Sequence, residues 1–198
     1  MVLVPTGVSN GILFLHTKRR NMMNWTVPNV TFMFREGDEL TEDGGCPIGG
    51  EFVAKTTQDL FAGKRVVLFS LPGAFTPTCS SKQLPGFEEG YNEFKNLGVD
   101  EIYCISVNDA FVMNEWARHL GIKNVKVIPD GTGQFTRLMG RLVDKSAIGF
   151  GYRSHRYAAV VNNGVIEKIF DEPGREDNFS SDPYGETSPE NVLAYLKA

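Results

Sequence analysis

The chain alternates between short apolar runs with the composition of β-strands and amphipathic segments with the spacing of helices. Residues 66–71 and 102–107 are nearly continuous apolar runs rich in β-branched and aromatic residues, which is typical of strands buried on both faces. Residues 125–128 form a shorter run of the same kind. These three runs predict the central strands of one sheet.

Two more pairs of strands are expected at the ends of the chain. Residues 157–161 and 165–170 flank Asn163-Gly164, and Asn-Gly between apolar runs is a strong signal for a β-hairpin. Residues 30–34 have strand composition, and residues 51–56 are their expected partner. The last two strands of the sequence are therefore expected to form an antiparallel pair.

Helices are predicted between these strands. Helical spacing of apolar residues indicates a helix to about residue 96 after Cys79, another after the capping pair Asn108-Asp109, and a last one after Ser188-Pro189. Shorter helical segments are predicted at residues 57–61 and 134–142. Strands that alternate with helices and close in an antiparallel hairpin plus a helix predict an α/β sandwich with a mixed sheet.

A chain of 198 residues suits one well-buried domain, which we expect to span residues 24–198. Residues 1–23 lack acidic side chains and end in a basic cluster. That composition is similar to a weak organelle transit peptide, and a flexible tail is the other interpretation. We expect a cytoplasmic protein unless this segment directs the chain to an organelle.

Charge and cysteine content exclude several classes of function. The net charge of −4 provides no basic surface for nucleic acid, and no apolar stretch reaches the length needed to cross a membrane. The three cysteines are too few and too irregularly spaced for a disulfide framework, which favours a reducing compartment. No second ligand stands at metal-site spacing from any of them, so we expect no metal centre.

The first central strand leads into the candidate site. Pro72-Gly73 ends the strand, and Thr76-Pro77 is typical of a helix N-cap followed by proline at the first helical position. Cys79 would then lie in the first turn, where free N–H groups and the helix dipole favour a thiolate. Pro72 could exclude water from the sulfur, and the Thr76 hydroxyl could bond to it. The alternative interpretation is an ordinary strand–turn–helix unit that contains a cysteine.

The segment Leu71-Pro72-Gly73-Ala74-Phe75-Thr76-Pro77-Thr78-Cys79-Ser80 resembles the active-site signature of the type II (peroxiredoxin-five-like) peroxiredoxins, within the alkyl hydroperoxide reductase/thiol-specific antioxidant superfamily. Similar motifs follow in the family's order at residues 84–87, 106–111, 129–131 and 153–157. The resemblance implies a thioredoxin-like fold with a central mixed β-sheet flanked by helices. It also implies that Arg156, which precedes the aromatic residue opening its strand, lines the active site.

The same resemblance implies a thiol-dependent peroxidase. The Cys79 thiolate would attack the O–O bond of hydrogen peroxide or an alkyl hydroperoxide and become a sulfenic acid, while Thr76 and Arg156 orient the peroxide. No cofactor or metal is needed for this step. The family implies a homodimer, for which Phe75 and Leu84 are apolar interface candidates near the cysteine. The alternative function is a peroxide sensor with little turnover.

The second thiol of the cycle is left open by the sequence. Some type II members carry a resolving cysteine before the last helix, but residues 183–188 contain none. We therefore favour a one-cysteine mechanism regenerated by glutathione and glutaredoxin, with thioredoxin as another reductant. Cys46 in a glycine-rich loop and Cys104 in a buried strand are the internal alternatives, although Cys104 is expected to be a small core residue. His155 is expected on the face opposite Arg156, at the surface.

Overall fold

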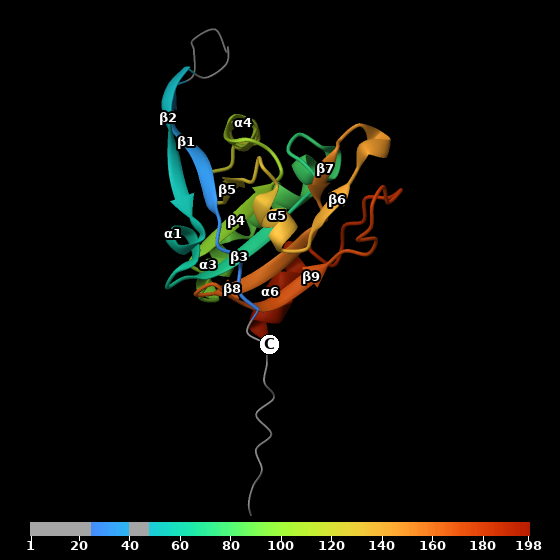
Figure 1. Ribbon diagram of the computed structural model, residues 1–198. Helices are drawn as coiled ribbons and strands as arrows, with labels where there is room; N and C mark the ends of the chain where they lie inside the picture. Colours follow the sequence, from blue (N-terminus) through green and yellow to red (C-terminus); the bar gives the residue numbers. More distant parts are fainter. Residues whose placement is uncertain (1–24, 40–47) are drawn as a thin grey trace, which may run out of the picture.

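The computed structural model describes residues 25–39 and 48–198, and its centre is a five-stranded mixed sheet in the order β5-β4-β3-β8-β9 (Figure 1). Strands β3, β4 and β5 run parallel, whereas β8 pairs antiparallel with both β3 and β9. This arrangement confirms the predicted mixed sheet. The strands are β3 (Arg65–Ser70), β4 (Glu101–Ser106), β5 (Lys126–Pro129), β8 (Tyr157–Asn162) and β9 (Val165–Asp171).

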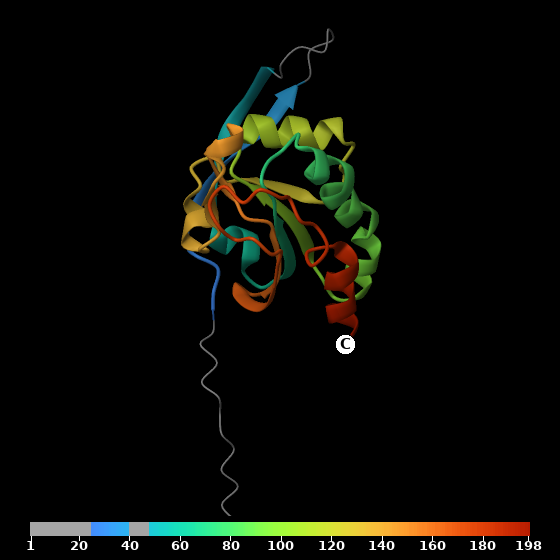
Figure 2. The same ribbon diagram turned by 90° about the vertical axis from the view of Figure 1, so that its right-hand side faces the viewer.

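Helices cover both faces of the sheet, and each face has its own core (Figure 2). Val67 and Phe69 of β3 point to the side of α2, α3, α4 and α6, while Val66 and Leu68 point to the side of α1, α5 and β1. This alternation follows from the two-residue period of a strand. The helices are α1 (Thr57–Phe61), α2 (Leu84–Glu89), α3 (Tyr91–Asn96), α4 (Ala110–His119), α5 (Gln134–Leu138) and α6 (Pro189–Lys197).

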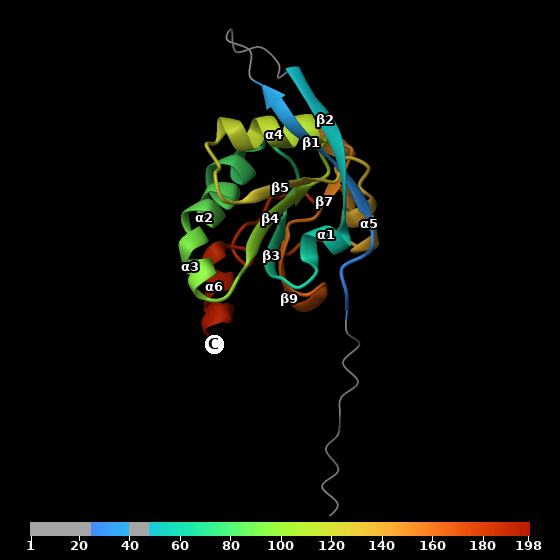
Figure 3. The ribbon, with the colours of Figure 1, turned by 90° about the vertical axis from the view of Figure 1, so that its left-hand side faces the viewer.

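A two-stranded hairpin of β1 (Thr31–Glu39) and β2 (Ile48–Thr56) runs alongside the main sheet near α4 and β5 (Figure 3). Both strands are longer than the sequence pattern indicated. The Asn114 side chain of α4 donates a hydrogen bond to the Arg35 carbonyl at 2.9 Å, which ties the hairpin to the body of the protein. The loop that carries Cys46 lies outside the described residues.

The turn between β8 and β9 is the predicted Asn-Gly hairpin. Asn163 and Gly164 both have positive φ angles, 48° and 79°, as a type I′ turn requires. The Asn163 side chain also accepts a hydrogen bond from the Gly63 N–H at 2.7 Å. The turn is therefore fixed against the start of the central strand β3.

One prediction about the second half of the chain is wrong. The helix expected at residues 134–142 ends at Leu138, because Gly140 adopts a φ of 66° and turns the chain. Leu142 instead begins β6 (Leu142–Asp144), which pairs with β7 (Tyr152–Ser154). Strands of three residues are too short to show a recognisable period in the sequence. No helix in the described part of the chain is long and apolar enough to span a membrane.

Candidate active site

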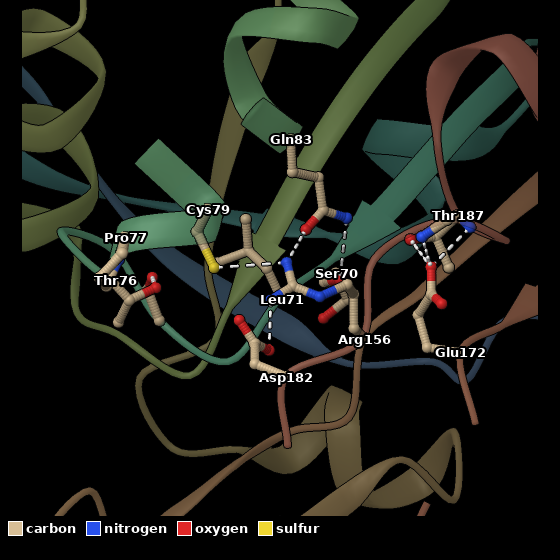
Figure 4. Close-up of polar contacts among 12 residues, drawn as sticks. Ser70, Leu71, Thr76, Pro77, Cys79, Gln83, Arg156, Glu172, Asp182 and Thr187 are labelled. Carbon is tan, nitrogen blue, oxygen red and sulfur yellow. Dashed lines mark hydrogen bonds and ion pairs between the residues drawn. The ribbon is translucent and has the colours of Figure 1, made fainter. Parts of the chain in front are cut away.

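The site begins where β3 ends and the chain turns into a helix. Phe75 adopts a left-handed φ of 59° in this turn, and helical backbone begins at Pro77. The Ser80 N–H donates to the Thr76 carbonyl at 3.0 Å and closes the first helical turn. Cys79 therefore lies in the first turn of the helix (Figure 4), and it is fully buried.

The helix is widened directly at the cysteine. Residues Cys79–Gln83 form one π-helical turn, in which the Leu84 N–H donates to the Cys79 carbonyl. Such turns are rare and are often found at functional sites. The turn leads into α2 with Pro85 in its first turn, where the missing N–H is tolerated. A break at Gly90 separates α2 from α3, so the helix predicted to residue 96 is divided in two.

Arg156 reaches the sulfur from the start of β8, 77 residues away in the sequence (Figure 4). Its side chain is 2% exposed, and Nη1 lies 3.5 Å from Cys79 Sγ. Nη2 forms an ion pair with Asp182 at 2.5 Å. Burial acts to lower the pKa of Arg156, but the charges of Cys79 and Asp182 outweigh it and raise that pKa above its usual value. The guanidinium therefore stays charged beside the sulfur.

Gln83 is a further side-chain partner of Arg156, and it was not identified from the sequence. Its Oε1 accepts a hydrogen bond from Arg156 Nη1, and its Nε2 faces the Ser70 carbonyl at 3.5 Å. The side chain is fully buried. The signal was present in the sequence, since a polar residue one turn after the cysteine interrupts the apolar face of the helix. Its partner, however, comes from a distant strand.

The neighbours of Arg156 in the sequence point elsewhere. Arg153 donates hydrogen bonds to the backbone carbonyls of Val107 and Phe150. His155 does lie apart from Cys79, but it is buried, so its expected surface position is wrong. Its Nε2 lies 3.0 Å from the Glu172 carbonyl, and burial lowers its pKa. The sequence could not show that the segment after β9 covers this position.

Thr76 and Pro72 line a pocket next to the cysteine. The Thr76 hydroxyl donates to the Gly73 carbonyl at 2.8 Å, so its hydrogen stabilises the turn while its lone pairs stay free to accept. The pocket has a volume of about 570 Å³. Its far wall consists of residues 145–150 and 178–182, with apolar surface from Ala147, Ile148, Phe150 and Phe179.

The loop between β9 and α6 is exposed along most of its length and is held in place by three sets of contacts. Glu172 is 4% exposed, and its carboxylate accepts hydrogen bonds from the Gly185 N–H, the Thr187 N–H and the Thr187 hydroxyl, each at 2.8 Å. The Asn178 N–H donates to the Asp144 carbonyl, and Asp182 pairs with Arg156. We call residues 172–187 the strap.

Three other residues that the sequence singled out are Cys104, Leu84 and Phe75. Cys104 is fully buried in β4 opposite Phe69, and burial together with the nearby Cys79 charge raises its pKa well above the ordinary value. It therefore stays a neutral core thiol. Leu84 is also fully buried and cannot serve in a dimer interface, which corrects that expectation, whereas Phe75 is 54% exposed.

Comparison with known proteins agrees with this geometry. Residues 27–183 match the family described as Redoxin. A peroxiredoxin from Rhizobium etli is 60% identical over 176 residues, which cover 89% of this chain and 97% of that relative.

Two solved structures are similar over nearly their whole length. The antioxidant protein of Plasmodium falciparum, described as a 1-Cys peroxiredoxin, has a TM-score of 0.80 at 40% identity, covering 88% of this chain and 98% of that one. Reduced peroxiredoxin Prx3 of Vibrio vulnificus in complex with hydrogen peroxide has a TM-score of 0.72 at 36% identity, covering 87% of this chain and 97% of that one. The chain belongs to the peroxiredoxins of the type II, peroxiredoxin-five-like branch, and is a thiol-dependent peroxidase with a thioredoxin-like fold.

Proposed function

We propose that Cys79 is the peroxide-reducing residue and that it works by a one-cysteine mechanism regenerated by glutathione and glutaredoxin. The observation that supports this most directly is the 3.5 Å contact between Arg156 Nη1 and Cys79 Sγ inside the protein. A buried guanidinium next to a sulfur stabilises the thiolate relative to the thiol. The thiolate is the nucleophile that peroxide reduction needs.

The reaction proceeds by displacement at oxygen. The Cys79 thiolate attacks the terminal oxygen of the hydroperoxide, an S–O bond forms, and the O–O bond breaks. Sulfur is oxidised by two electrons and becomes a sulfenic acid. The other oxygen leaves as hydroxide or alkoxide and takes up a proton to give water or an alcohol. Hydrogen peroxide and alkyl hydroperoxides are the substrates we propose.

Three neighbours of Cys79 have roles in this step. Arg156 stabilises the negative charge that moves from sulfur to the leaving oxygen, through N–H groups that are already oriented. The Thr76 oxygen accepts a hydrogen bond from the O–H of the peroxide, since its own hydrogen is used by Gly73. Pro72 is buried beside them and shields the sulfur from water.

An external thiol is favoured for the second half of the cycle. Cys104 lies in the middle of β4, between β3 and β5, and reaching Cys79 as a disulfide partner would require distortion of the central sheet. A small thiol would approach through the pocket that Pro72, Thr76 and Thr78 line next to Cys79. Glutathione would condense with the sulfenic acid, releasing water and forming a mixed disulfide. A second glutathione, delivered through glutaredoxin, would then restore the thiolate and leave as oxidised glutathione.

The test is to oxidise the reduced protein with one equivalent of hydrogen peroxide, with and without glutathione, and to map the products by mass spectrometry. We expect a Cys79–glutathione adduct that glutaredoxin removes. A disulfide from Cys79 to Cys46 or Cys104 that forms faster than this adduct would overturn the one-cysteine mechanism. Steady-state peroxide consumption with glutathione and glutaredoxin, run beside thioredoxin, identifies the reductant.

A further inference from the structure

We propose that Asp182 determines the charge preference of the site and makes this enzyme discriminate against hydroperoxides that carry a negative charge. The inference rests on the proposed function of Cys79 and adds a substrate class to it. The strap brings a carboxylate to the arginine that contacts the Cys79 sulfur and to the wall of the pocket beside it. Neutral hydroperoxides are therefore favoured over anionic ones of the same shape.

The position of Asp182 is the first argument. Its carboxylate lies 2.5 Å from Arg156 Nη2, and the same guanidinium contacts Cys79 Sγ through Nη1. Asp182 also lines the 570 Å³ pocket together with Pro72 and Thr76, whereas Arg156 does not line it. The carboxylate therefore contacts the guanidinium and also faces the pocket; Figure 4 shows it next to Arg156.

The charges around the sulfur are the second argument. When Cys79 is a thiolate, two negatively charged groups, Cys79 and Asp182, lie next to the single positive charge of Arg156. A neutral hydroperoxide adds no charge to this group. A hydroperoxide with a carboxylate adds a third negative charge within the pocket, and charges in a partly buried site repel more strongly than in water.

Two structural features bear on the strength of this effect. The Asp182 side chain is 48% exposed, so salt in solution will partly screen its charge. Lys145 lines the same pocket and has the opposite sign, and among the described residues no hydrogen bond or ion pair joins it to Cys79 or Arg156. Asp182 is also held in place, because Glu172 fixes the end of the strap at Gly185 and Thr187.

The experiment compares two matched substrates in a single turnover. One is a tertiary alkyl hydroperoxide that bears a terminal carboxylate, and the other is its neutral methyl ester. The rate constant for sulfenic acid formation at Cys79 is measured by rapid quench and mass spectrometry for wild type, Asp182→Asn, Asp182→Glu and Asp177→Asn. Asp177 is the matched control, because it lies on the same strap and loses the same charge but bonds to the Asp144 N–H away from the site.

We expect Asp182→Asn to raise the ratio of the acid rate constant to the ester rate constant by about fivefold to tenfold at low salt. Asp182→Glu and Asp177→Asn should leave this ratio near that of the wild type. In the wild type, added salt should raise the ratio, because it screens repulsion. A disturbed fold would change both rate constants together and leave the ratio unchanged.

Two results would overturn the inference while the proposed function stands. One is an unchanged ratio in Asp182→Asn, and the other is a wild-type ratio that falls with salt, which would mean that attraction by Lys145 or Arg156 dominates. If neither substrate oxidises Cys79 in the wild type, the proposed function fails instead. The two failures are therefore distinct.

Discussion

Removing the Arg156 guanidinium is the most direct test of how Cys79 is activated. In Arg156→Ala, the sulfur loses a positive charge 3.5 Å away, and Gln83 loses the donor of its buried hydrogen bond. Asp182 then has no positive partner, so its negative charge acts on the sulfur without compensation. All three changes disfavour the thiolate. Oxidation of Cys79 by peroxide should accordingly be slower.

The size of the effect follows from the distance. Two unit charges 3.5 Å apart interact by about 5 kcal/mol at an effective dielectric constant of about 20. Asp182 already neutralises part of the guanidinium charge, and water will enter the space that the side chain leaves. We therefore expect a net loss of about 2 kcal/mol in the stabilisation of the reacting charge, which corresponds to oxidation that is roughly thirtyfold slower.

The assay measures the rate constant for sulfenic acid formation at Cys79 after addition of hydrogen peroxide, with the modified peptide quantified by mass spectrometry so that Cys46 and Cys104 do not contribute. Arg153→Ala is the matched control, because Arg153 bonds to the Val107 and Phe150 carbonyls. We expect its rate constant to stay close to that of the wild type. Equal losses of rate in the two variants, or no loss in Arg156→Ala, would refute the reasoning.

Three further predictions concern the cysteines, the strap and the assembly. Cys79→Ser should abolish steady-state peroxide consumption, whereas Cys104→Ser should largely retain it; turnover in the first variant would remove Cys79 from the mechanism. Glu172→Gln should lower the free energy of unfolding by about 1–3 kcal/mol at neutral pH, measured by urea denaturation. Burial raises the pKa of Glu172, but its hydrogen bonds with Gly185 and Thr187 outweigh this and lower it, so its contribution is present at neutral pH and disappears as the carboxylate is protonated in acid. The two denaturation curves should therefore converge at low pH, and a constant gap would contradict this. Finally, we expect a homodimer by sedimentation at micromolar concentration, weakened by substitution of the exposed Phe75 with serine, and a monomer at all concentrations would oppose it.

The parts of the fold that the sequence predicts well are those with local signals. The Asn163-Gly164 hairpin, the buried strands and the Asp109 cap of α4 each depend on residues adjacent in the chain. The pair of short strands β6 and β7 was missed, because three residues carry no detectable period. The end of α5 was also predicted wrongly. Apolar residues at helical spacing suggested a longer helix, but one glycine with a positive φ turns the chain and ends it.

The candidate site likewise has features that local sequence predicts and features that depend on distant residues. The placement of Cys79 in the first turn of a helix follows from Pro72-Gly73 and Thr76-Pro77, all within eight residues. The positions of Gln83 and Asp182 depend on contacts with Arg156, which is more than 20 residues from either. The burial of His155 likewise depends on the distant segment at Glu172. Long-range contacts of this kind leave no periodic signal in one sequence.

The three partners of Arg156 explain how a buried cation can remain in place through a redox cycle. In the proposed cycle Cys79 becomes a neutral sulfenic acid, and the guanidinium would then lose one of its two anionic neighbours. A buried charge without a partner would be costly. Asp182 remains as the counter-charge, and Gln83 holds the orientation of Nη1 as a neutral acceptor that does not compete with the thiolate for charge. In the proposed one-cysteine cycle, Arg156 would therefore be in position to bind the thiolate again as soon as the external thiol has released it.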